Sequence, residues 1–403
     1  MSATSKAAGL SPTLRKRIRR LKRTGCLLDI ASAVTPARAR AHPGGRVGVL
    51  LLWGIGDAVL SVPLLRGLKT AWPDCSVEVI GRPFLADLFR GESMVDRVHA
   101  LVAPWAAYEH KYTIWDRSWR DFAGQVRALR KVKFDWLVSV RMDPRDNLLM
   151  RVLRAKARFG LSAGGGRHWL TQRWDITAHD YHQMYRGEEA ARACHLLTGG
   201  MPPVEPSFDR NRDNADAARH RLRAAGWRRE RILVVSFGAG RRLRSWDAAK
   251  INAALKQAKA HIKFLVLVDD GSEICRQIEV PPGVPWHNWR SDLYELKGLL
   301  SVADVIFCAD SGVMHMAAAE GCKVVSIFGP TSPPTFGVRG AQHRILAVDP
   351  MPCRPCFDIC VYPSPLCLDN LSTVKVHDAL AAAFADQNGV IDAYGNEKEI
   401  QPD

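Results

Sequence analysis

Residues 303–330 read ADVIFCADSGVMHMAAAEGCKVVSIFGP, and the order of apolar and polar residues in this stretch predicts a strand, a helix and a second strand. The run VIFCA is short and apolar and ends at the turn Asp310-Ser311-Gly312, as expected of a strand buried on both faces. Helix formers follow at once, and KVVSIF repeats the strand pattern. The stretch therefore indicates a βαβ unit and a parallel sheet.

The same alternation runs along the chain and restarts after the Gly- and Pro-rich stretch GGMPPVEP at 199–206. Before it, VGVLLLW, VEVIG and FDWLVSVR (134–141) predict strands, and after it ILVVSF and KFLVLV do so as well. We predict an α/β protein with two doubly wound domains, whose strands end at a central cleft. The expected divisions are a basic extension (1–45), two α/β domains (46–200 and 207–349), a cysteine segment (350–370), a helix (371–388) and a tail (389–403).

The composition is that of a basic globular protein. The 403 residues include 57 Lys and Arg against 41 Asp and Glu, a formal charge of +16, which attracts anions such as nucleic acid, acidic lipid and phosphorylated substrates. No apolar window is long enough for a membrane-spanning helix, and the N-terminus lacks the pattern of a secretory signal. We expect a cytoplasmic protein with reduced thiols. A nucleic-acid-binding protein is the rival class, but it leaves the paired α/β halves unexplained, so we expect no nucleic-acid partner.

The basic extension contains LRKRIRRLKR at 14–23. Leu14, Ile18 and Leu21 recur at helical spacing, so a helix there would carry a thin apolar stripe and a basic coat. Two interpretations stay open. The helix lies on an anionic membrane surface, or the segment is a solvated basic tail.

The turn Asp310-Ser311-Gly312 leaves a strand and starts a helix. The first amides of a helix have no partner within it, and together with the helix dipole they suit a phosphate group. Ser311 can add a hydroxyl donor, Gly312 allows close approach of the backbone, and His315 follows about one turn later. The alternative interpretation is an ordinary helix cap, for which Asp and Ser are preferred residues.

Two further turns follow predicted strands. FGAGRRLRSW (237–246) places Gly238 and Gly240 beside arginines, of which Arg241, Arg242 and Arg244 could neutralise a pyrophosphate, unless the loop is only an exposed basic one.

GIGDAV begins like a dinucleotide fingerprint with Gly54 and Gly56, but Val59 replaces the third glycine, which disfavours a nicotinamide or flavin dehydrogenase. Asp57 in this turn is either a general base or a helix cap.

Two longer stretches carry a family resemblance. IGDAVLSVPLLRGLKTAWPD (55–74) is similar to the pattern L-G-D, an apolar stretch, L-P-x-L-x-x-L-K and W-P. DSGVMHMAAAEGCKVVSIFGPTSP (310–333) is similar to D-[ST]-G-x-x-H-x-A-A-A followed by F-G-P-T. With these motifs, residues 46–385 resemble glycosyltransferase family 9, the ADP-heptose glycosyltransferases of lipopolysaccharide core assembly. The resemblance implies a GT-B architecture of two Rossmann-like domains and inverting transfer of a heptose.

The resemblance also implies roles for individual residues. Asp57 matches the expected base in the N-terminal, acceptor-binding domain. Arg244 stands two residues before Trp246, where relatives often carry a phosphate-binding lysine, and Glu273 is a weaker candidate for the ribose hydroxyls. The residues expected around the pyrophosphate and donor sugar are Asp310, Ser311, Gly312 and His315. Val313 departs from the pattern, because many relatives have proline there.

The implied partners are ADP-heptose or another nucleotide sugar as donor, and the lipopolysaccharide core as acceptor. A hydroxyl of an autotransporter protein is the alternative acceptor. We expect no metal in catalysis, because cationic side chains and a helix N-terminus can hold the phosphates.

The cysteine segment reads CRPCFDICVYPSPLC. Four thiols within fifteen residues, in a C-x2-C-x3-C-x6-C spacing, could close around one zinc or iron ion at a structural site. Similar cysteine clusters occur in parts of the resembling family, in which the autotransporter-modifying enzymes bind iron. The spacing is not that of a zinc finger, and free thiols are the alternative. The expected ligands are Cys353, Cys356, Cys360 and Cys367.

Overall fold

The computed structural model describes residues 11–33, 45–106, 117–238, 242–356 and 358–385. The chain divides into two compact units, Met1–Pro206 (unit 1) and Ser207–Asp403 (unit 2), and each is described by itself. Gly240 and Arg241, as well as the tail at 389–403, lie outside the described residues. No helix in the described part of the chain has the length and apolar character needed to cross a membrane.

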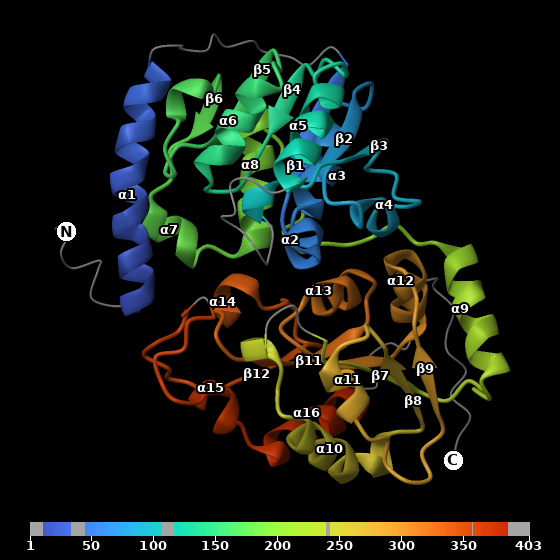
Figure 1. The fold of residues 1–403 in the computed structure, drawn as a ribbon. Coiled ribbons are helices and arrows are strands. Elements are labelled where there is room, and N and C mark those ends of the chain that lie inside the picture. Colours follow the sequence, from blue (N-terminus) through green and yellow to red (C-terminus); the bar gives the residue numbers. More distant parts are fainter. Residues whose placement is uncertain (1–10, 34–44, 107–116, 239–241, 357, 386–403) are drawn as a thin grey trace. The chain divides into compact units, whose positions relative to one another are not determined.

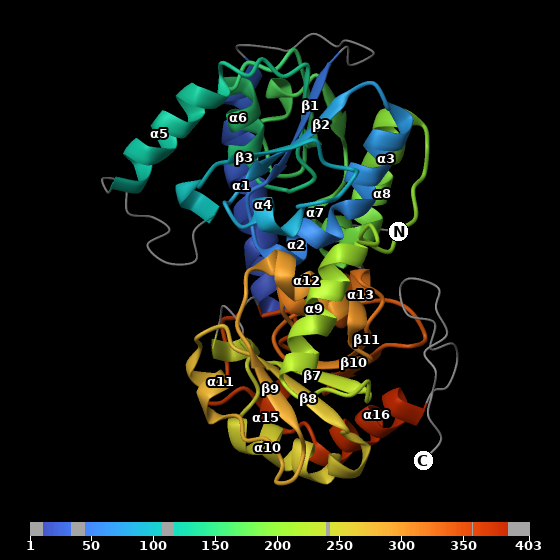
Figure 2. The same cartoon turned by 90° about the vertical axis from the view of Figure 1, so that its right-hand side faces the viewer.

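Unit 1 contains a parallel sheet with the strand order β3-β2-β1-β4-β5-β6 (Figure 1). Its strands are β1 (Arg46–Leu51), β2 (Ser76–Gly81), β3 (Arg97–Ala100), β4 (Trp136–Val138), β5 (Ala157–Leu161) and β6 (Gln172–Trp174). Its helices are α1 (Pro12–Ala33), α2 (Ile55–Leu60), α3 (Val62–Ala71), α4 (Leu85–Leu88), α5 (Arg117–Leu129), α6 (Pro144–Val152), α7 (Ala178–Gln183) and α8 (Arg186–Thr198), with 3-10 turns η2 (Pro104–Ala106) and η3 (Arg167–Trp169). Helices α3 and α8 pack side by side on one face of this sheet (Figure 2).

Unit 2 contains a second parallel sheet, with the order β12-β11-β10-β7-β8-β9. Its strands are β7 (Ile232–Ser236), β8 (Phe264–Val268), β9 (Trp286–Trp289), β10 (Val305–Ala309), β11 (Lys323–Phe328) and β12 (Arg344–Ala347). Its helices are α9 (Arg212–Ala224), α10 (Ala248–Gln257), α11 (Glu273–Gln277), α12 (Leu293–Val302), α13 (Gly312–Ala319), α14 (Pro333–Phe336), α15 (Leu366–Asp369) and α16 (Thr373–Ala385), with 3-10 turns η4 (Arg242–Arg244) and η5 (Lys259–His261).

Both sheets have the doubly wound order, in which the first strand of the unit pairs with the second on one side and the fourth on the other. The prediction of two doubly wound α/β domains is therefore confirmed. In unit 1 the strand order reverses between β1 and β4, and in unit 2 between β7 and β10. Ligands of such sheets bind at the carboxyl ends of the strands beside this reversal.

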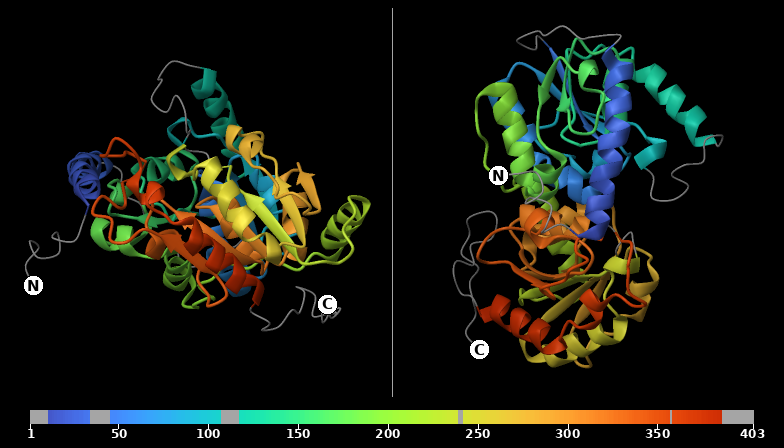
Figure 3. Two further views of the ribbon diagram at one scale, coloured as in Figure 1. Left: turned by 90° about the horizontal axis from the view of Figure 1, so that it is seen from below. Right: turned by 90° about the vertical axis from the view of Figure 1, so that its left-hand side faces the viewer.

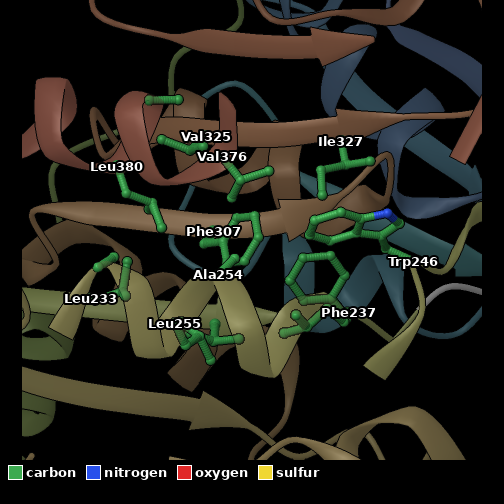
Figure 4. Close-up of a cluster of buried hydrophobic side chains, with 14 of the residues drawn as sticks. Leu233, Phe237, Trp246, Ala254, Leu255, Phe307, Val325, Ile327, Val376 and Leu380 are labelled. Atoms are coloured by element: carbon green, nitrogen blue, oxygen red, sulfur yellow. The ribbon is translucent and has the colours of Figure 1, made fainter. Parts of the chain in front are cut away.

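The core of unit 2 explains how its turns are held. Phe237 at the end of β7 packs edge-on against Phe307 of β10, with ring centroids 4.7 Å apart. Trp246, 1% exposed, follows the arginine loop and donates its indole N–H to the carbonyl of Leu368 at 3.0 Å. Figure 4 shows Trp246 and Phe237 beside Ile327 of β11. The apolar residues that flank the turns thus fix both ends of the arginine loop.

Helix α1, the dark blue helix in Figure 3, lies along unit 1. It packs against η3. Leu14 and Ile18, two residues of the predicted apolar stripe, are only 2% and 9% exposed. The main-chain N–H of Arg167 donates to Asp29 at 3.0 Å. A Cβ added to Gly165, which has a φ of +97°, would lie 2.6 Å from the Cα of Gly25, so this close approach requires glycine at position 165.

Part of one strand prediction is wrong. FDWLVSVR was expected to be a strand through Arg141, but β4 ends at Val138. The chain leaves the sheet after Ser139, whose hydroxyl donates to Asp146 of α6 at 3.2 Å and whose Oγ accepts the N–H of Arg141 at 3.4 Å. This side-chain turn replaces the ladder and directs Arg141 away from the strand.

Candidate functional site

Asp57 lies in the first turn of α2, directly after β1. Its Oδ2 accepts the main-chain N–H of Gly54 at 3.3 Å, so one of its two carboxylate oxygens caps the helix, as one of the two interpretations predicts. Its Oδ1 lies 2.9 Å from Nη1 of Arg141, and the Asp57 side chain is 39% exposed. Gly54 has an ordinary φ of −82°, so its conformation does not require glycine. The carboxylate is therefore oriented by two donors and still reaches solvent.

A cavity of about 30 Å³ adjoins Asp57, enough for one water molecule. Its polar lining consists of Asp57, Ser61, Arg141, Tyr181, Arg186 and Glu189, and Trp53 forms part of its apolar wall. The guanidinium of Arg141 lies 3.9 Å from the centroid of the Trp53 ring, so a cation–π contact holds the arginine in addition to its ion pair.

Arg186 and Glu189 form a buried ion pair on α8 behind this cavity. Glu189 is 2% exposed. Burial raises the pKa of Glu189 to about 7, against the opposing effect of Arg186, and the charge of Asp57 contributes to the increase. The guanidinium of Arg186 also lies 3.9 Å from the centroid of the Tyr181 ring. The Asp57 carboxylate is thus close to two arginines and one strongly perturbed carboxyl group.

In unit 2, Ser311 is the N-cap residue of α13, but its side chain makes no capping hydrogen bond. Its Oγ is buried and has no hydrogen-bond partner among the described residues. Ser311 thus occupies the position of a helix cap, as one interpretation predicts, but its hydroxyl does not cap the helix. A buried hydroxyl without a partner at a helix N-terminus fits a missing acceptor, because buried polar groups normally have partners.

Asp310 and His315, which flank this position, are buried, at 4% and 5% exposure. Asp310 Oδ2 accepts the hydroxyl of Thr331 at 2.6 Å.

Arg244 brings the arginine loop to the same place. Its Nη1 lies 3.5 Å from Asp310 Oδ2, so the two predicted loops meet at the β7–β10 reversal. Its Nε and Nη2 donate to the two carboxylate oxygens of Asp358 at 3.1 and 3.3 Å. The structure therefore assembles Arg244, Asp310 and the start of α13 into one cluster.

Two further residues of the predicted donor site, Gly238 and Glu273, make their contacts with the turn after β8 and with α11. A Cβ on Gly238 would overlap the carboxylate of Asp270, so glycine is required there. Asp270 Oδ1 in turn accepts the N–H of Ser272 at 2.9 Å, which fixes the turn after β8. Glu273 is exposed at the start of α11, and its Oε1 accepts from Gln277 at 3.4 Å. Its contact with a ribose stays a prediction.

The cysteine segment is not an assembled metal site. Within the described residues, no three His, Cys, Asp or Glu side chains form a group that could hold a metal ion. Cys367 is nevertheless within electrostatic reach of the other three thiols. The pKa of Cys367 is raised to about 11, mainly by burial; Arg354 opposes this increase, and Cys356, Cys353 and Cys360 contribute to it.

Sequence reasoning missed Arg141 and Asp358. Arg141 was placed at the end of a strand, and Asp358 was considered only as a spacer between cysteines. Neither residue carries a local signal, because each acts through a partner more than eighty residues away in the chain. For Arg141, it is the order of the strands that brings β4 beside β1, the strand that precedes Asp57.

Known proteins are similar to this chain in sequence. Lipopolysaccharide heptosyltransferase 3 of Escherichia coli is 22% identical over 296 residues, which cover 68% of this chain and 81% of that protein. Lipopolysaccharide heptosyltransferase 1 of Pseudomonas aeruginosa is 22% identical over 364 residues, 84% of this chain and 97% of that protein.

Solved structures are similar in fold. ADP-heptose LPS heptosyltransferase II of E. coli superposes with a TM-score of 0.65 at 16% identity, over 85% of this chain and 100% of that one, which supports the GT-B fold. The family model described as glycosyltransferase family 9 (heptosyltransferase) matches residues 124–363, which is more than half of the chain. On this match the chain belongs to glycosyltransferase family 9 and is a transferase.

Proposed function

We propose that this transferase moves a heptose from ADP-heptose to a hydroxyl group of the lipopolysaccharide inner core, with inversion at the anomeric carbon. The acceptor oxygen forms a new bond to that carbon and gives its proton to Asp57. The bond from the anomeric carbon to the β-phosphate oxygen breaks, and ADP leaves with the electron pair. No redox step and no metal are needed for this balance.

The observation that carries the proposal is the unpartnered Ser311 hydroxyl beside Arg244 at the start of α13. ADP gains negative charge as it leaves, and donors arranged in advance around such charge are often the largest catalytic contribution. The donors here are the Ser311 hydroxyl, the first amides of α13 and the Arg244 guanidinium, and none of them is a reactive group. They suit a group that is bound and released, such as a diphosphate.

Asp57 is suited to the role of general base because two existing contacts orient its carboxylate. A sugar hydroxyl is a weak nucleophile and needs a proton acceptor during attack. Each carboxylate oxygen has two lone pairs, so Asp57 can accept a further proton donor while Arg141 and the N–H of Gly54 fix its plane. The adjoining cationic side chains Arg141 and Arg186 also suit an acceptor that carries negative charge.

The names of the sequence relatives, which are lipopolysaccharide heptosyltransferases, support this choice of acceptor class. The test incubates the purified protein with ADP-heptose and either heptose-deficient lipopolysaccharide or an autotransporter protein. We expect label on the lipopolysaccharide and release of ADP. If only the autotransporter protein is labelled, it replaces lipopolysaccharide as the proposed acceptor. If ADP is released but neither acceptor is labelled, both acceptors are rejected.

We also propose that the enzyme works on the cytoplasmic side of the inner membrane, in contact with anionic lipid. Leu14 and Ile18 are buried, whereas Arg15, Lys16 and Arg19 on the same helix are exposed. Attraction to lipid would therefore depend on charge instead of an apolar stripe, and it should weaken as salt is added. Vesicles with and without an anionic lipid test this directly in a flotation assay.

For the cysteine segment we propose a structural zinc or iron ion held by Cys353, Cys356, Cys360 and Cys367. Four thiolates within electrostatic reach are a suitable donor set for either metal. These side chains do not form a close ligand group among the described residues, so binding would require the segment to close around the ion. No step of the transfer depends on this ion.

A further inference from the structure

We propose that Asp358 of the cysteine segment is a positioning residue for Arg244, and that it sets the affinity of the transferase for the diphosphate of its donor. The inference rests on the proposed function, because it takes Arg244 as a contact to that diphosphate. It extends the function to a segment whose cysteines were expected only to bind a metal.

The contact between the two residues is a fork. Nε and Nη2 of Arg244 donate to Oδ1 and Oδ2 of Asp358 at 3.1 and 3.3 Å, so both oxygens meet one edge of the guanidinium. A bidentate pair of this kind fixes the rotation of the guanidinium plane, as well as its distance. The Asp358 side chain is 7% exposed, against 31% for Arg244, so the carboxylate is the buried and fixed partner.

The direction of the fork matters for an anion. Nη1 of Arg244 lies across the guanidinium from the Nε–Nη2 edge and points to Asp310, 3.5 Å away, at the start of α13. Asp358 therefore holds the arginine from the side opposite to the expected phosphates. Its negative charge is separated from them by the guanidinium, so the gain from orientation should exceed the cost of repulsion.

Asp358 itself is held by its own segment. It has a φ of +62°, a left-handed conformation that Asp and Asn adopt more readily than most residues. Just before it, the N–H of Cys356 donates to the carbonyl of Pro330 at 3.1 Å. Nε of Arg354 donates to the carbonyl of Gly329 at 2.9 Å. The segment is thus fixed to the turn that follows β11.

The physical effect is on the cost of binding. An arginine side chain loses considerable rotational freedom when it is fixed on a ligand. With Asp358 present, Arg244 loses this rotational freedom when the protein folds. The loss therefore no longer weakens the binding of the ligand. Immobilisation of one such side chain changes a dissociation constant by about five- to tenfold.

The experiment measures ADP binding by calorimetry in the full chain, with ADP as the probe. The variants are Asp358→Asn, Arg244→Ala and both together, and Arg244→Lys replaces Arg244→Ala if the latter does not fold. Asp349→Asn is the matched control, because Asp349 pairs with Arg354 of the same segment at 2.6 Å and not with Arg244. Melting temperatures of every variant show that the proteins are folded.

We expect Asp358→Asn to raise the Kd for ADP by about five- to tenfold, and to have no further effect once Arg244 is replaced. Asp349→Asn should bind ADP as the wild type does. An unchanged or tighter Kd in Asp358→Asn, or an equal loss with and without Arg244, overturns the inference while the proposed function stands. If replacement of Arg244 leaves ADP binding unchanged, the donor-site assignment fails and this inference fails with it.

Discussion

Oδ1 of Asp57 lies 2.9 Å from Nη1 of Arg141, and the two residues follow β1 and β4, the adjacent strands at which the order of the first sheet reverses. The contact therefore occurs where doubly wound sheets bind their ligands. It also joins a carboxylate with a proposed chemical role to an arginine that packs on Trp53. The orientation of the base thus depends on a residue from a distant part of the chain.

Replacement of Arg141 by glutamine should lower kcat by about ten- to a hundredfold, because small misplacements of a catalytic group are costly. The Kd for ADP should not change. Arg141→Lys should retain more activity, since it can keep the ion pair but loses the planar contact with Trp53. Steady-state kinetics with saturating donor checks this, and equal activity of the Arg141→Gln variant and the wild-type enzyme would contradict it.

Replacement of Asp57 by asparagine should lower kcat by about a thousandfold and leave ADP binding intact, because the amide keeps an acceptor for the Gly54 N–H but cannot take the acceptor's proton. Asp87→Asn is the control, since Asp87 pairs with Arg90 in the same unit. Single-turnover transfer measures the chemical step directly. Near-normal turnover of the Asp57 variant would remove it from the base role.

Ser311→Ala should separate stability from function. The Ser311 hydroxyl is buried without a partner, so its removal should change the free energy of unfolding by less than about 1 kcal/mol. The KM for the donor should nevertheless rise about tenfold, as expected for loss of one hydrogen bond to a charged group. Ser301→Ala makes the opposite comparison, because Ser301 donates to the carbonyl of Gly298 at 2.9 Å. That control should lose stability and keep its KM.

Glu189 should give unit 1 a pH-dependent stability. Burial raises its pKa from the ordinary 4.5 to about 7, so the folded protein holds the proton more tightly than the unfolded chain. This contribution is fully present below the unfolded pKa and is lost as the pH rises through about 7. The loss between about pH 5 and pH 8 should be up to about 3 kcal/mol greater in wild type than in Glu189→Gln. Urea unfolding at both pH values measures it, and equal losses would contradict the shift.

A metal in the cysteine segment should be visible in protein purified without added metal, at about one zinc or iron ion per chain. Cys360→Ser should lower that content and the melting temperature, whereas Cys75→Ser, outside the segment, should keep the metal. Elemental analysis of both variants decides the matter. Protein that is fully folded and free of metal would contradict the metal site and show that the four cysteines are free thiols.

The sequence was most informative where burial alone determines structure. Runs such as VIFCA and KVVSIF are apolar on both faces, which only a covered strand can satisfy, and they form β10 and β11. The turns after those strands were located for the same reason. Asp310 and Arg244 were assigned to one phosphate site from separate loops, and the structure places them 3.5 Å apart.

The sequence was least informative in two cases. In the first, a side chain competes with the main-chain hydrogen bonds of a strand; in the second, it contacts a distant part of the chain. Ser139 ends β4 early by hydrogen bonding to its neighbours, which hydrophobic pattern does not reveal. Likewise, the apolar stripe at Leu14 and Ile18 predicts an amphipathic helix but not the surface that covers it. Such partners depend on contacts between distant residues, and a single sequence does not record them.

The shared strand order of the two sheets has a consequence for engineering. Each sheet has its own buried cluster and its own reversal point, one lined by a carboxylate and the other by a guanidinium. Under the proposed function, a hybrid enzyme spliced after Pro206 would inherit its acceptor chemistry from one parent and its nucleotide preference from the other.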